Sequence, residues 1–226
     1  MLFRRALRRF SPEVVVHLAG VTAPLRSQSS DQVEAINVAS VNTIVEAASE
    51  CGIHRVVFSS SSAIYGDTRT FPLSEVQPPD PLTAYGESKL RAEQLLRSAL
   101  PALETISLRI YNVFGASGTS SLVSRLQRST ATEPVPIRGP DNFVRDYVHV
   151  EDVAAAVFAA INVDLPQKDI VVNIGTGIPT SNRQLITRLS SRGPVHFLPV
   201  GGEPSYSCAD AGLATRILGF TSKNRI

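Results

Sequence analysis

Short runs of β-branched residues alternate with helical patterns along most of this sequence, and this alternation constrains the fold more than any other feature. The runs are typical of buried strands and the longer periodic segments of amphipathic helices. The predicted elements are a strand over 14–18, a helix over 33–50, a strand over 55–59, a helix over 84–100 and a strand over 105–111. Gly52 stands in the C-cap position of the first helix, and Pro101 stops the second. The pattern predicts an α/β fold with a doubly wound parallel sheet.

The composition changes in the second half of the chain. Between Gly115 and Gly139 the sequence is rich in Ser, Thr, Gly and Pro around one amphipathic stretch at 122–128. A helix over 153–161, a strand over 169–174 and a helix over 184–189 follow. We therefore expect a main domain over 1–112 and a smaller α/β lobe over 113–226, with 142–177 returning to the main domain because the two lobes interleave.

Composition permits this architecture and excludes some partners. With 226 residues and 43% hydrophobic content, the chain can bury the core of one or two lobes. The net charge of +2 is too small to indicate a nucleic acid or a membrane surface as partner, and no apolar run approaches the roughly 20 residues that span a bilayer. Cys51 and Cys208 lack metal-type spacing and make a poor disulfide framework, so we interpret both as reduced thiols of a soluble, cytoplasmic protein.

The first ten residues form an arginine-rich amphipathic pattern without acidic residues and without the apolar core of a secretory signal. A solvated helix is the favoured interpretation of this segment. An organelle-targeting segment is the alternative.

Tyr85 and Lys89 are four positions apart and therefore lie on one face of the predicted helix. A phenol that acts as a base at neutral pH needs a pKa lowered by roughly 3 units, or about 4 kcal/mol, and a nearby ammonium supplies part of this. A hydroxyl from the serine run 59–62 can both donate and accept a hydrogen bond. Together these residue types indicate proton transfer at a hydroxyl that undergoes redox chemistry. Each pattern alone is a weak signal, since a solvated helix face also explains it.

Six signatures in a common order strengthen this interpretation. They are 17–20 with Asn37, 57–66, Tyr85 with Lys89, 108–115, 145–153 and 173–177. They resemble the extended short-chain dehydrogenase/reductase family, in its NAD-dependent epimerase/dehydratase branch of the UDP-glucose 4-epimerase type, from near Pro12 to about Phe220. The resemblance implies a Rossmann-like domain that binds NAD and a lobe that binds a nucleotide-sugar substrate.

The same resemblance implies the site residues. It makes Ser61, Tyr85 and Lys89 catalytic, with Ser61 chosen because it lies four positions before Tyr65 and Ser62 as the runner-up. The implied cofactor-binding residues are Leu18, Ala19, Gly20, Asn37, Ser59, Tyr85, Lys89 and Tyr111. The implied substrate-binding residues are Ser61, Ser62, Asn112 and Arg145. No metal is expected. Without the resemblance, His17 and Tyr111 could be ordinary core residues and Asn37 a helix-surface amide.

The sequence departs from the family pattern on the substrate side. In the family's sugar dehydratases an Asp-Glu pair performs the elimination, whereas Ser62 and Ala63 occupy that place here. Without two carboxyl groups there is no acid/base couple for removing water, which favours epimerisation or simple carbonyl reduction. A second arginine of the family is replaced within residues 200–203, and Arg183 and Arg192 are the candidates to compensate for it.

No glycine-rich turn of the G-x-G-x-x-G type follows a predicted strand, although dinucleotide-binding folds begin with one. By resemblance, we expect the dinucleotide-binding domain to be incomplete, with roughly two βα units of about 30 residues each missing. The residues that decide between NAD and NADP lie in that segment, so this choice stays open.

Three hypotheses follow. The leading one is an NAD-dependent nucleotide-sugar epimerase that works through a 4-keto intermediate. The first alternative is an NAD(P)-dependent 4-keto-sugar reductase, which consumes NADH. The second is a truncated, non-catalytic homologue or a fragment. The family also implies a homodimer in which the helices over 33–50 and 84–100 form a four-helix bundle.

Overall fold

The computed structural model describes residues 2–21, 30–68, 71–99, 103–115 and 121–226, which fall into two compact units. Unit 1 comprises Met1–Gly66, Gln77–Arg109 and Val157–Val172, and unit 2 comprises Asp67–Val76, Ile110–Ala156 and Asn173–Ile226. Each unit is thus assembled from segments that are distant in the sequence. The division into lobes at residue 112 stays a prediction.

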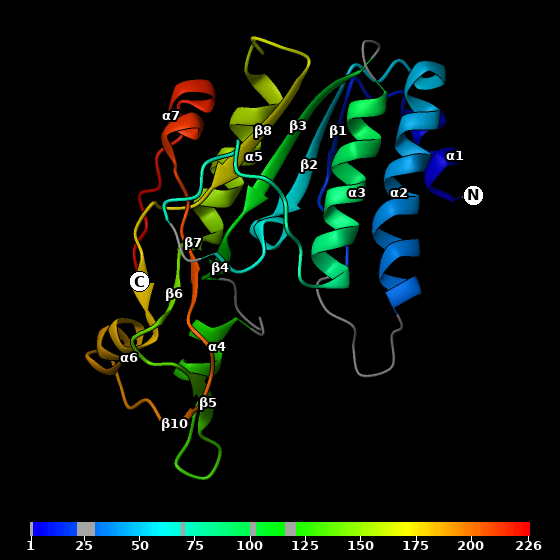
Figure 1. The fold of residues 1–226 in the computed structure, drawn as a ribbon. Coiled ribbons are helices and arrows are strands. Elements are labelled where there is room, and N and C mark those ends of the chain that lie inside the picture. The colour runs from blue at the N-terminus through cyan, green and yellow to red at the C-terminus, as the bar shows by residue number, and fades with distance from the viewer. Residues whose placement is uncertain (1, 22–29, 69–70, 100–102, 116–120) are drawn as a thin grey trace. The chain divides into compact units, whose positions relative to one another are not determined.

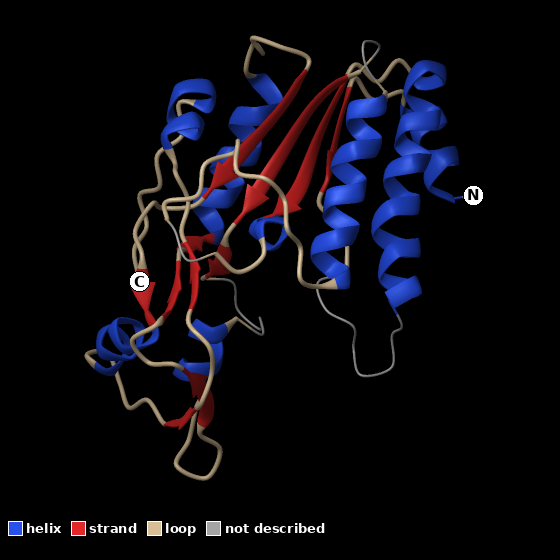
Figure 2. Cartoon of the chain, in the orientation of Figure 1, coloured by secondary structure: helices blue, strands red, loops and turns tan. Residues whose placement is uncertain are grey.

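Unit 1 is built around a four-stranded sheet with the strand order β1-β2-β3-β8. Its strands are β1 (Val14–His17), β2 (Arg55–Ser61), β3 (Glu104–Ile110) and β8 (Asp169–Ile174). Strands β1 and β2 pair in parallel, with Val14 opposite Arg55, and the arrows of β2, β3 and β8 point the same way in Figure 2. Parallel strands need crossover connections, which helices supply here. The predicted parallel α/β fold is confirmed.

Three helices pack together on one face of this sheet: α1 (Leu2–Phe10), α2 (Ser30–Cys51) and α3 (Ala84–Ser98) (Figure 1). A cluster of buried apolar side chains from these helices and from β1 and β2 forms the core, with Phe58 of β2 among its members. The second half of α5 (Val150–Asn162) also belongs to unit 1. Its last carbonyl groups accept hydrogen bonds from the buried Arg55, at 2.8 Å for Ile161, which suits a helix C-terminus.

The ends of α2 and α3 follow local signals in the sequence. Gly52 directly after α2 has φ +72°, and the amide of Ile53 donates to the carbonyl of Ala48 at 3.0 Å, so the predicted C-cap is confirmed. Helix α3 begins after Thr83, whose hydroxyl accepts from the amide of Gly86 at 3.1 Å. The expected stop at Pro101 lies outside the described residues.

Unit 2 consists of short strand pairs and helices around its own apolar cluster. The strands are β4 (Asn112–Phe114), β5 (Val135–Arg138), β6 (Phe143–Arg145), β7 (Tyr147–His149), β9 (Thr180–Ser181), β10 (Phe197–Val200) and β11 (Ser205–Ser207). Parallel pairing joins β4 to β7 and β5 to β10, whereas β6 lies between β11 and β9. The helices are α4 (Leu122–Gln127), α6 (Asn182–Ser190) and α7 (Gly212–Leu218). The sequence analysis did not predict these strands or α7, because such short elements carry little periodicity.

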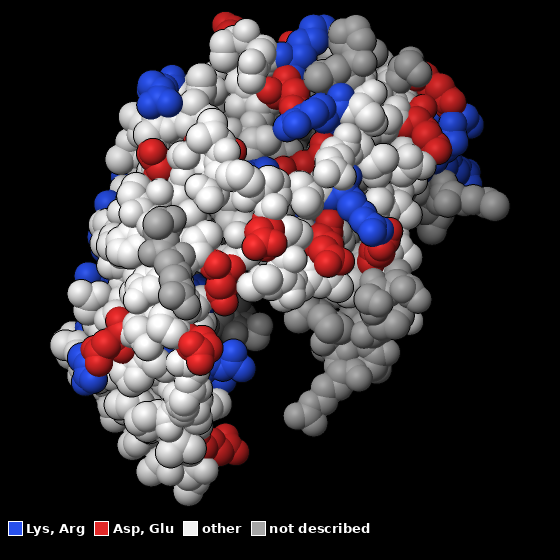
Figure 3. Space-filling model, in the orientation of Figure 1, with Lys and Arg blue, Asp and Glu red and all other residues white. Residues whose placement is uncertain are grey.

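On the face shown in Figure 3, Lys and Arg side chains are interspersed with Asp and Glu, in keeping with the small net charge of +2. Both cysteines are buried and free. Among the residues that the structure describes, no helix is long and apolar enough to cross a membrane.

Candidate active site

The candidate site lies in unit 1, where β2 ends and the 3-10 helix η1 (Ser62–Tyr65) follows. The hydroxyl of Ser61 caps η1 by accepting from the amide of Ala63 at 3.2 Å. A Cβ atom at Gly86 would lie only 2.7 Å from the carbonyl oxygen of Ala63, so the first turn of α3 approaches η1 as closely as a residue without a side chain allows. This approach lets Tyr85 and Ser61 share a hydrogen bond.

Lys89 lies one helical turn after Tyr85 and is 3% exposed. Its Nζ donates to the carbonyl oxygen of Ser59 at 2.7 Å, and it lies 4.7 Å from the ring centroid of Phe58 and 5.8 Å from that of Tyr85. Burial lowers the pKa of Lys89 to about 8, and the carboxylate of Glu93 opposes this shift. The structure therefore brings Ser61, Tyr85 and Lys89 together, with Ser59 as a partner of the lysine.

The pKa of Tyr85 differs from expectation. We expected the ammonium of Lys89 to lower it, but burial raises it, and the hydrogen bond with Ser61 opposes the rise. The Nζ of Lys89 donates to the carbonyl of Ser59, and desolvation of the phenolate outweighs the stabilisation present. Ser61 is thus the group that favours the ionised form of Tyr85 in this geometry.

Asn37 holds the segment that follows β1. Its Oδ1 accepts from the amide of Val21 at 2.8 Å, and its Nδ2 donates to the carbonyl of Val21 at 3.1 Å and to the hydroxyl of Ser88 at 2.9 Å. The side chain is buried, so the alternative interpretation of a helix-surface amide is wrong. Asn37 therefore ties the end of β1 to both α2 and α3.

The strand end itself is open. Leu18, Ala19 and Gly20 are exposed, and a Cβ atom at Gly20 would lie 3.0 Å from Oδ1 of Asn37 and 3.3 Å from Nζ of Lys89. A side chain at Gly20 would crowd Asn37 and Lys89, so the backbone of the strand end lies close to both. An accessible backbone, a cation and a phenol thus meet at the carboxyl ends of β1 and β2, where ligands of open parallel sheets bind.

His17 is a buried core residue beside this site. Its Nε2 shares a hydrogen bond with the hydroxyl of Ser40 at 3.0 Å, and its ring stacks on Phe58 with centroids 5.9 Å apart. Burial lowers the pKa of His17, and the positive charge of Lys89 lowers it further. Both influences favour the neutral ring.

Three predicted site residues, Tyr111, Asn112 and Arg145, belong to unit 2. Tyr111 is buried, and its amide donates to the carbonyl of Ile174 at 3.0 Å. The backbone amide and the side-chain Nδ2 of Asn112 both donate to the carbonyl of Asp146, each at 3.1 Å.

The guanidinium of Arg145 is held by its neighbours in unit 2. Its Nη1 donates to the carbonyl oxygens of Val144 at 2.8 Å and Ser205 at 3.0 Å, and its Nη2 donates to the hydroxyl of Ser205 at 2.7 Å. The carboxylate of Asp67 lies 3.8 Å from Nη2, and the guanidinium stacks 3.8 Å from the ring centroid of Phe143. Burial lowers the pKa of Arg145, and Asp67 opposes this shift.

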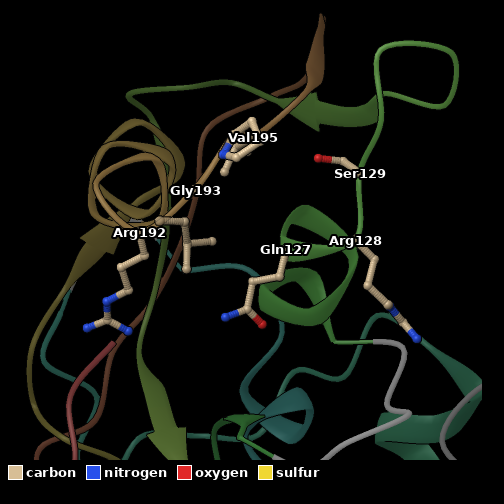
Figure 4. A pocket seen from close by; sticks show the side chains of 8 residues that line it. Gln127, Arg128, Ser129, Arg192, Gly193 and Val195 are labelled. Carbon is tan, nitrogen blue, oxygen red and sulfur yellow. The ribbon is translucent and has the colours of Figure 1, made fainter.

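The two arginines considered as compensating residues have different surroundings. Arg183 forms a two-point ion pair with Asp141, at 2.5 and 2.7 Å. Arg192 lines a cavity of about 320 Å³ in unit 2. In Figure 4 the side chains of Arg192 and Arg128 point away from one another, with Gln127 between them. No predicted catalytic, cofactor-binding or substrate-binding residue lines this cavity.

The sequence analysis assigned no individual role to four buried polar residues around this site: Ser60, Ser88, Glu93 and Arg109. A signal for Glu93 was available, since it follows Tyr85 and Lys89 at helical spacing and therefore shares their face of α3. Arg109 had no local signal. Within the described part of the chain, no group of three or more His, Cys, Asp or Glu side chains is arranged to hold a metal ion.

Comparison with known proteins identifies the family. The sequence model of the NAD dependent epimerase/dehydratase family matches residues 2–175. The chain belongs to this family. It is 32% identical over 210 residues to a UDP-glucose 4-epimerase of Azospirillum brasilense, with 83% of this chain and 60% of the relative covered. It is also 32% identical to a putative UDP-glucose 4-epimerase of Methanocaldococcus jannaschii, with 91% of this chain and 67% of that protein covered.

Solved structures of the family share the fold. MoeE5 in complex with UDP-glucuronic acid and NAD has a TM-score of 0.88 and 29% identity, with all of this chain and 78% of MoeE5 covered. The UDP-glucose 4-epimerase of Thermotoga maritima with UDP-glucose has a TM-score of 0.84 and 29% identity, with 98% of this chain and 77% of that chain covered. The chain spans only 60–63% of the length of several curated relatives that it matches.

Proposed function

We propose that this chain carries the proton-transfer site of an NAD-dependent nucleotide-sugar 4-epimerase. The observation that carries the proposal is the convergence of Ser61, Tyr85 and Lys89 beside the accessible strand end at Gly20. The family membership and the NAD and UDP-sugar complexes of similar proteins support it.

The residues present fit the nicotinamide ribose half of NAD. The exposed backbone of Leu18, Ala19 and Gly20 is accessible to a ligand, and the ammonium of Lys89 beside Gly20 would donate to ribose hydroxyls. Asn37 would keep this strand end in place, and Ser59 would orient Lys89 through its carbonyl. The family resemblance also assigns Tyr111 to the cofactor. When bound, NAD would supply the hydride acceptor for oxidation of the sugar carbinol and the hydride donor for its reduction.

The side chains of the site supply the proton transfer. Tyr85 as phenolate takes the proton of the sugar hydroxyl and later returns it, and Ser61 hydrogen-bonds the phenol and positions the substrate oxygen. Lys89 would hold positive charge near Tyr85, which would offset part of the desolvation that disfavours the phenolate. This proton transfer needs no pair of carboxyl groups, in agreement with Ser62 and Ala63 at the position of the dehydratase pair.

We assign the nucleotide sugar to Ser62, Asn112 and Arg145. Arginine binds phosphate oxygens through a planar fork, and the contacts of Arg145 to Ser205 would hold that fork in one orientation. The ion pair of Arg183 with Asp141 makes that residue a poor replacement for the second family arginine.

We further propose a cytoplasmic homodimer in which α2 and α3 of two chains form a four-helix bundle. Two free, buried cysteines suit a reducing compartment. Ile36 of α2 is 45% exposed and offers apolar contact area on that helix.

The decisive experiment compares the chain with its Tyr85→Phe variant. Calorimetry with NAD and with NADH measures cofactor binding, and conversion of UDP-glucose to its 4-epimer measures turnover. We expect Tyr85→Phe to reduce turnover by roughly 1,000-fold while cofactor binding persists, because the phenol hydroxyl takes part in the chemical step. The matched control is Tyr206→Phe, which removes a hydroxyl from a ring that stacks on Phe71 in unit 2.

Each outcome has a consequence. Full turnover by Tyr85→Phe would contradict the assignment of Tyr85. Net consumption of NADH when a 4-keto sugar nucleotide is supplied would favour the keto-sugar reductase. Failure of the unmodified chain to bind either cofactor would favour the non-catalytic alternative.

A further inference from the structure

A buried polar cluster lies directly behind the candidate site in unit 1. Glu93 accepts hydrogen bonds from Arg109 at 3.1 and 2.8 Å and from the hydroxyl of Ser60 at 2.5 Å. Glu93 and Arg109 are both only 4% exposed, and the guanidinium of Arg109 lies 4.7 Å from the ring centroid of Tyr65. Taking such a pair out of water is unfavourable unless its geometry is good, so its position calls for an explanation.

The cluster is continuous with the site through two facing segments. Tyr85, Lys89 and Glu93 follow one another at four-residue spacing on α3 and so share one face. They contact three consecutive residues of β2: Tyr85 contacts Ser61, Lys89 contacts the carbonyl of Ser59, and Glu93 contacts the hydroxyl of Ser60. Glu93 is the last of the three residues on α3, and Arg109 of β3 holds it in place by a hydrogen bond.

The charge of Glu93 also acts on Lys89. The burial that lowers the pKa of Lys89 favours the neutral amine, and Glu93 is the carboxylate that favours the ammonium. The other titratable groups around Lys89 are His17 from β1 and Tyr85 from its own helix. Neither supplies negative charge in the neutral form that burial favours.

We propose that Glu93 is a positioning residue for Lys89: fixed by Arg109 and Ser60, it aligns α3 with β2 and holds negative charge one helical turn from the ammonium. This inference rests on the proposed function, because it gives Lys89 the work of a cation at the nicotinamide end of the site. It adds a carboxylate and its buried partner to the three residues that carry the chemistry.

The test is the ionisation of Lys89 in the free chain, which needs neither cofactor nor substrate. The sequence contains three lysines, Lys89, Lys168 and Lys223, so a chain labelled with ¹³C at lysine Cε gives a simple spectrum whose resonances are followed against pH. We expect Glu93→Gln to lower the midpoint of Lys89 by about one pH unit, because it removes the nearby negative charge and leaves the side-chain volume unchanged.

The matched control is Glu87→Gln, which makes the same change at an exposed residue of the same helix. Glu87 precedes Lys89 by two positions, and residues at that spacing do not face each other on a helix. Its substitution should therefore leave the midpoint of Lys89 where it is.

The results separate the proposal from its alternatives. The proposal is supported if the titration midpoint of Lys89 falls in Glu93→Gln but does not change in Glu87→Gln, and if the other two lysines are unaffected. An unchanged midpoint, or an equal fall in both variants, overturns it. Removing one partner of a buried pair is strongly destabilising, so Glu93→Gln combined with Arg109→Gln serves if the single variant does not fold. A smaller fall is expected there, because the positive charge of Arg109 is removed together with the negative charge of Glu93, and its absence would likewise overturn the proposal.

A defect in epimerase turnover plays no part in this measurement. If the unmodified chain bound neither NAD nor NADH and showed no turnover while Glu93→Gln still lowered the midpoint of Lys89, the proposed function would fail and the positioning role would stand. If Tyr85→Phe were inactive while Glu93→Gln left the midpoint of Lys89 unchanged, the positioning role of Glu93 would fail and the epimerase assignment would stand.

Discussion

At the scale of single residues, the site is defined by charges that burial disfavours. Lys89 is almost removed from water, and its ordinary pKa is lowered to about 8, whereas Glu93 and the carbonyl of Ser59 favour its charged form. With a pKa in this range, the charge of a lysine depends on the groups around it, whereas an arginine stays charged throughout. The positive charge of Lys89 also acts on His17, because it lowers the pKa of that imidazole.

Lys89→Met should therefore raise the pKa of His17. Burial, the larger influence, would remain, so the value should still lie below that of an ordinary histidine. The measurement is a pH titration of the imidazole resonances of the four histidines by NMR. Lys223→Met is the control. A His17 titration unchanged in Lys89→Met would show that the ammonium and the imidazole do not interact as the structure has them.

At the scale of secondary-structure elements, the start of α3 is placed by contacts that combine local and distant segments. Thr83 caps the helix, which is a local signal, whereas the approach of Gly86 to the carbonyl of Ala63 depends on η1. Packing therefore explains why a glycine, Gly86, follows Tyr85. It allows the hydrogen bond between Tyr85 and Ser61 to form.

Gly86→Ala should destabilise the chain by about 1–3 kcal/mol, because the added Cβ forces α3 away from η1. Denaturant unfolding measures the loss. The control is Gly193→Ala, since a Cβ at Gly193 would meet no atom within 4 Å. Equal stability of the two variants would mean that η1 yields to the new methyl group.

At the scale of the whole molecule, each unit is assembled from segments that are far apart in the sequence. Residues 157–172 return to unit 1, and residues 67–76 contribute to unit 2. The proposed homodimer belongs to this scale, because α2 and α3 together, and neither helix alone, provide the surface of a four-helix bundle.

Ile36→Asp should convert the proposed dimer to a monomer, since a carboxylate buried in an apolar interface lacks a partner. Analytical ultracentrifugation measures the mass of each variant. Phe158→Asp is the control, because Phe158 is 70% exposed but lies on α5. A wild-type chain that sediments as a monomer, or an Ile36→Asp variant that remains dimeric, would refute the bundle.

Much of unit 1 could be predicted from the sequence. The strands of its parallel sheet and helices α2 and α3 carry strong periodicity and caps, and Tyr85 and Lys89 are close in sequence, so helical geometry alone puts them on one face. The short strands of unit 2 were not predicted, because two to four residues carry too little pattern.

Local pattern therefore determined the fold class and the identity of the Tyr-Lys pair, since both depend on residues that are near one another along the chain. Only the tertiary structure decided how these groups are charged and held. The raised pKa of Tyr85, the burial of Asn37 and the pairing of Glu93 with Arg109 depend on desolvation and on contacts between elements far apart in sequence. The free energies of desolvation and of these contacts arise only when the elements pack, so residue spacing along the chain does not predict them.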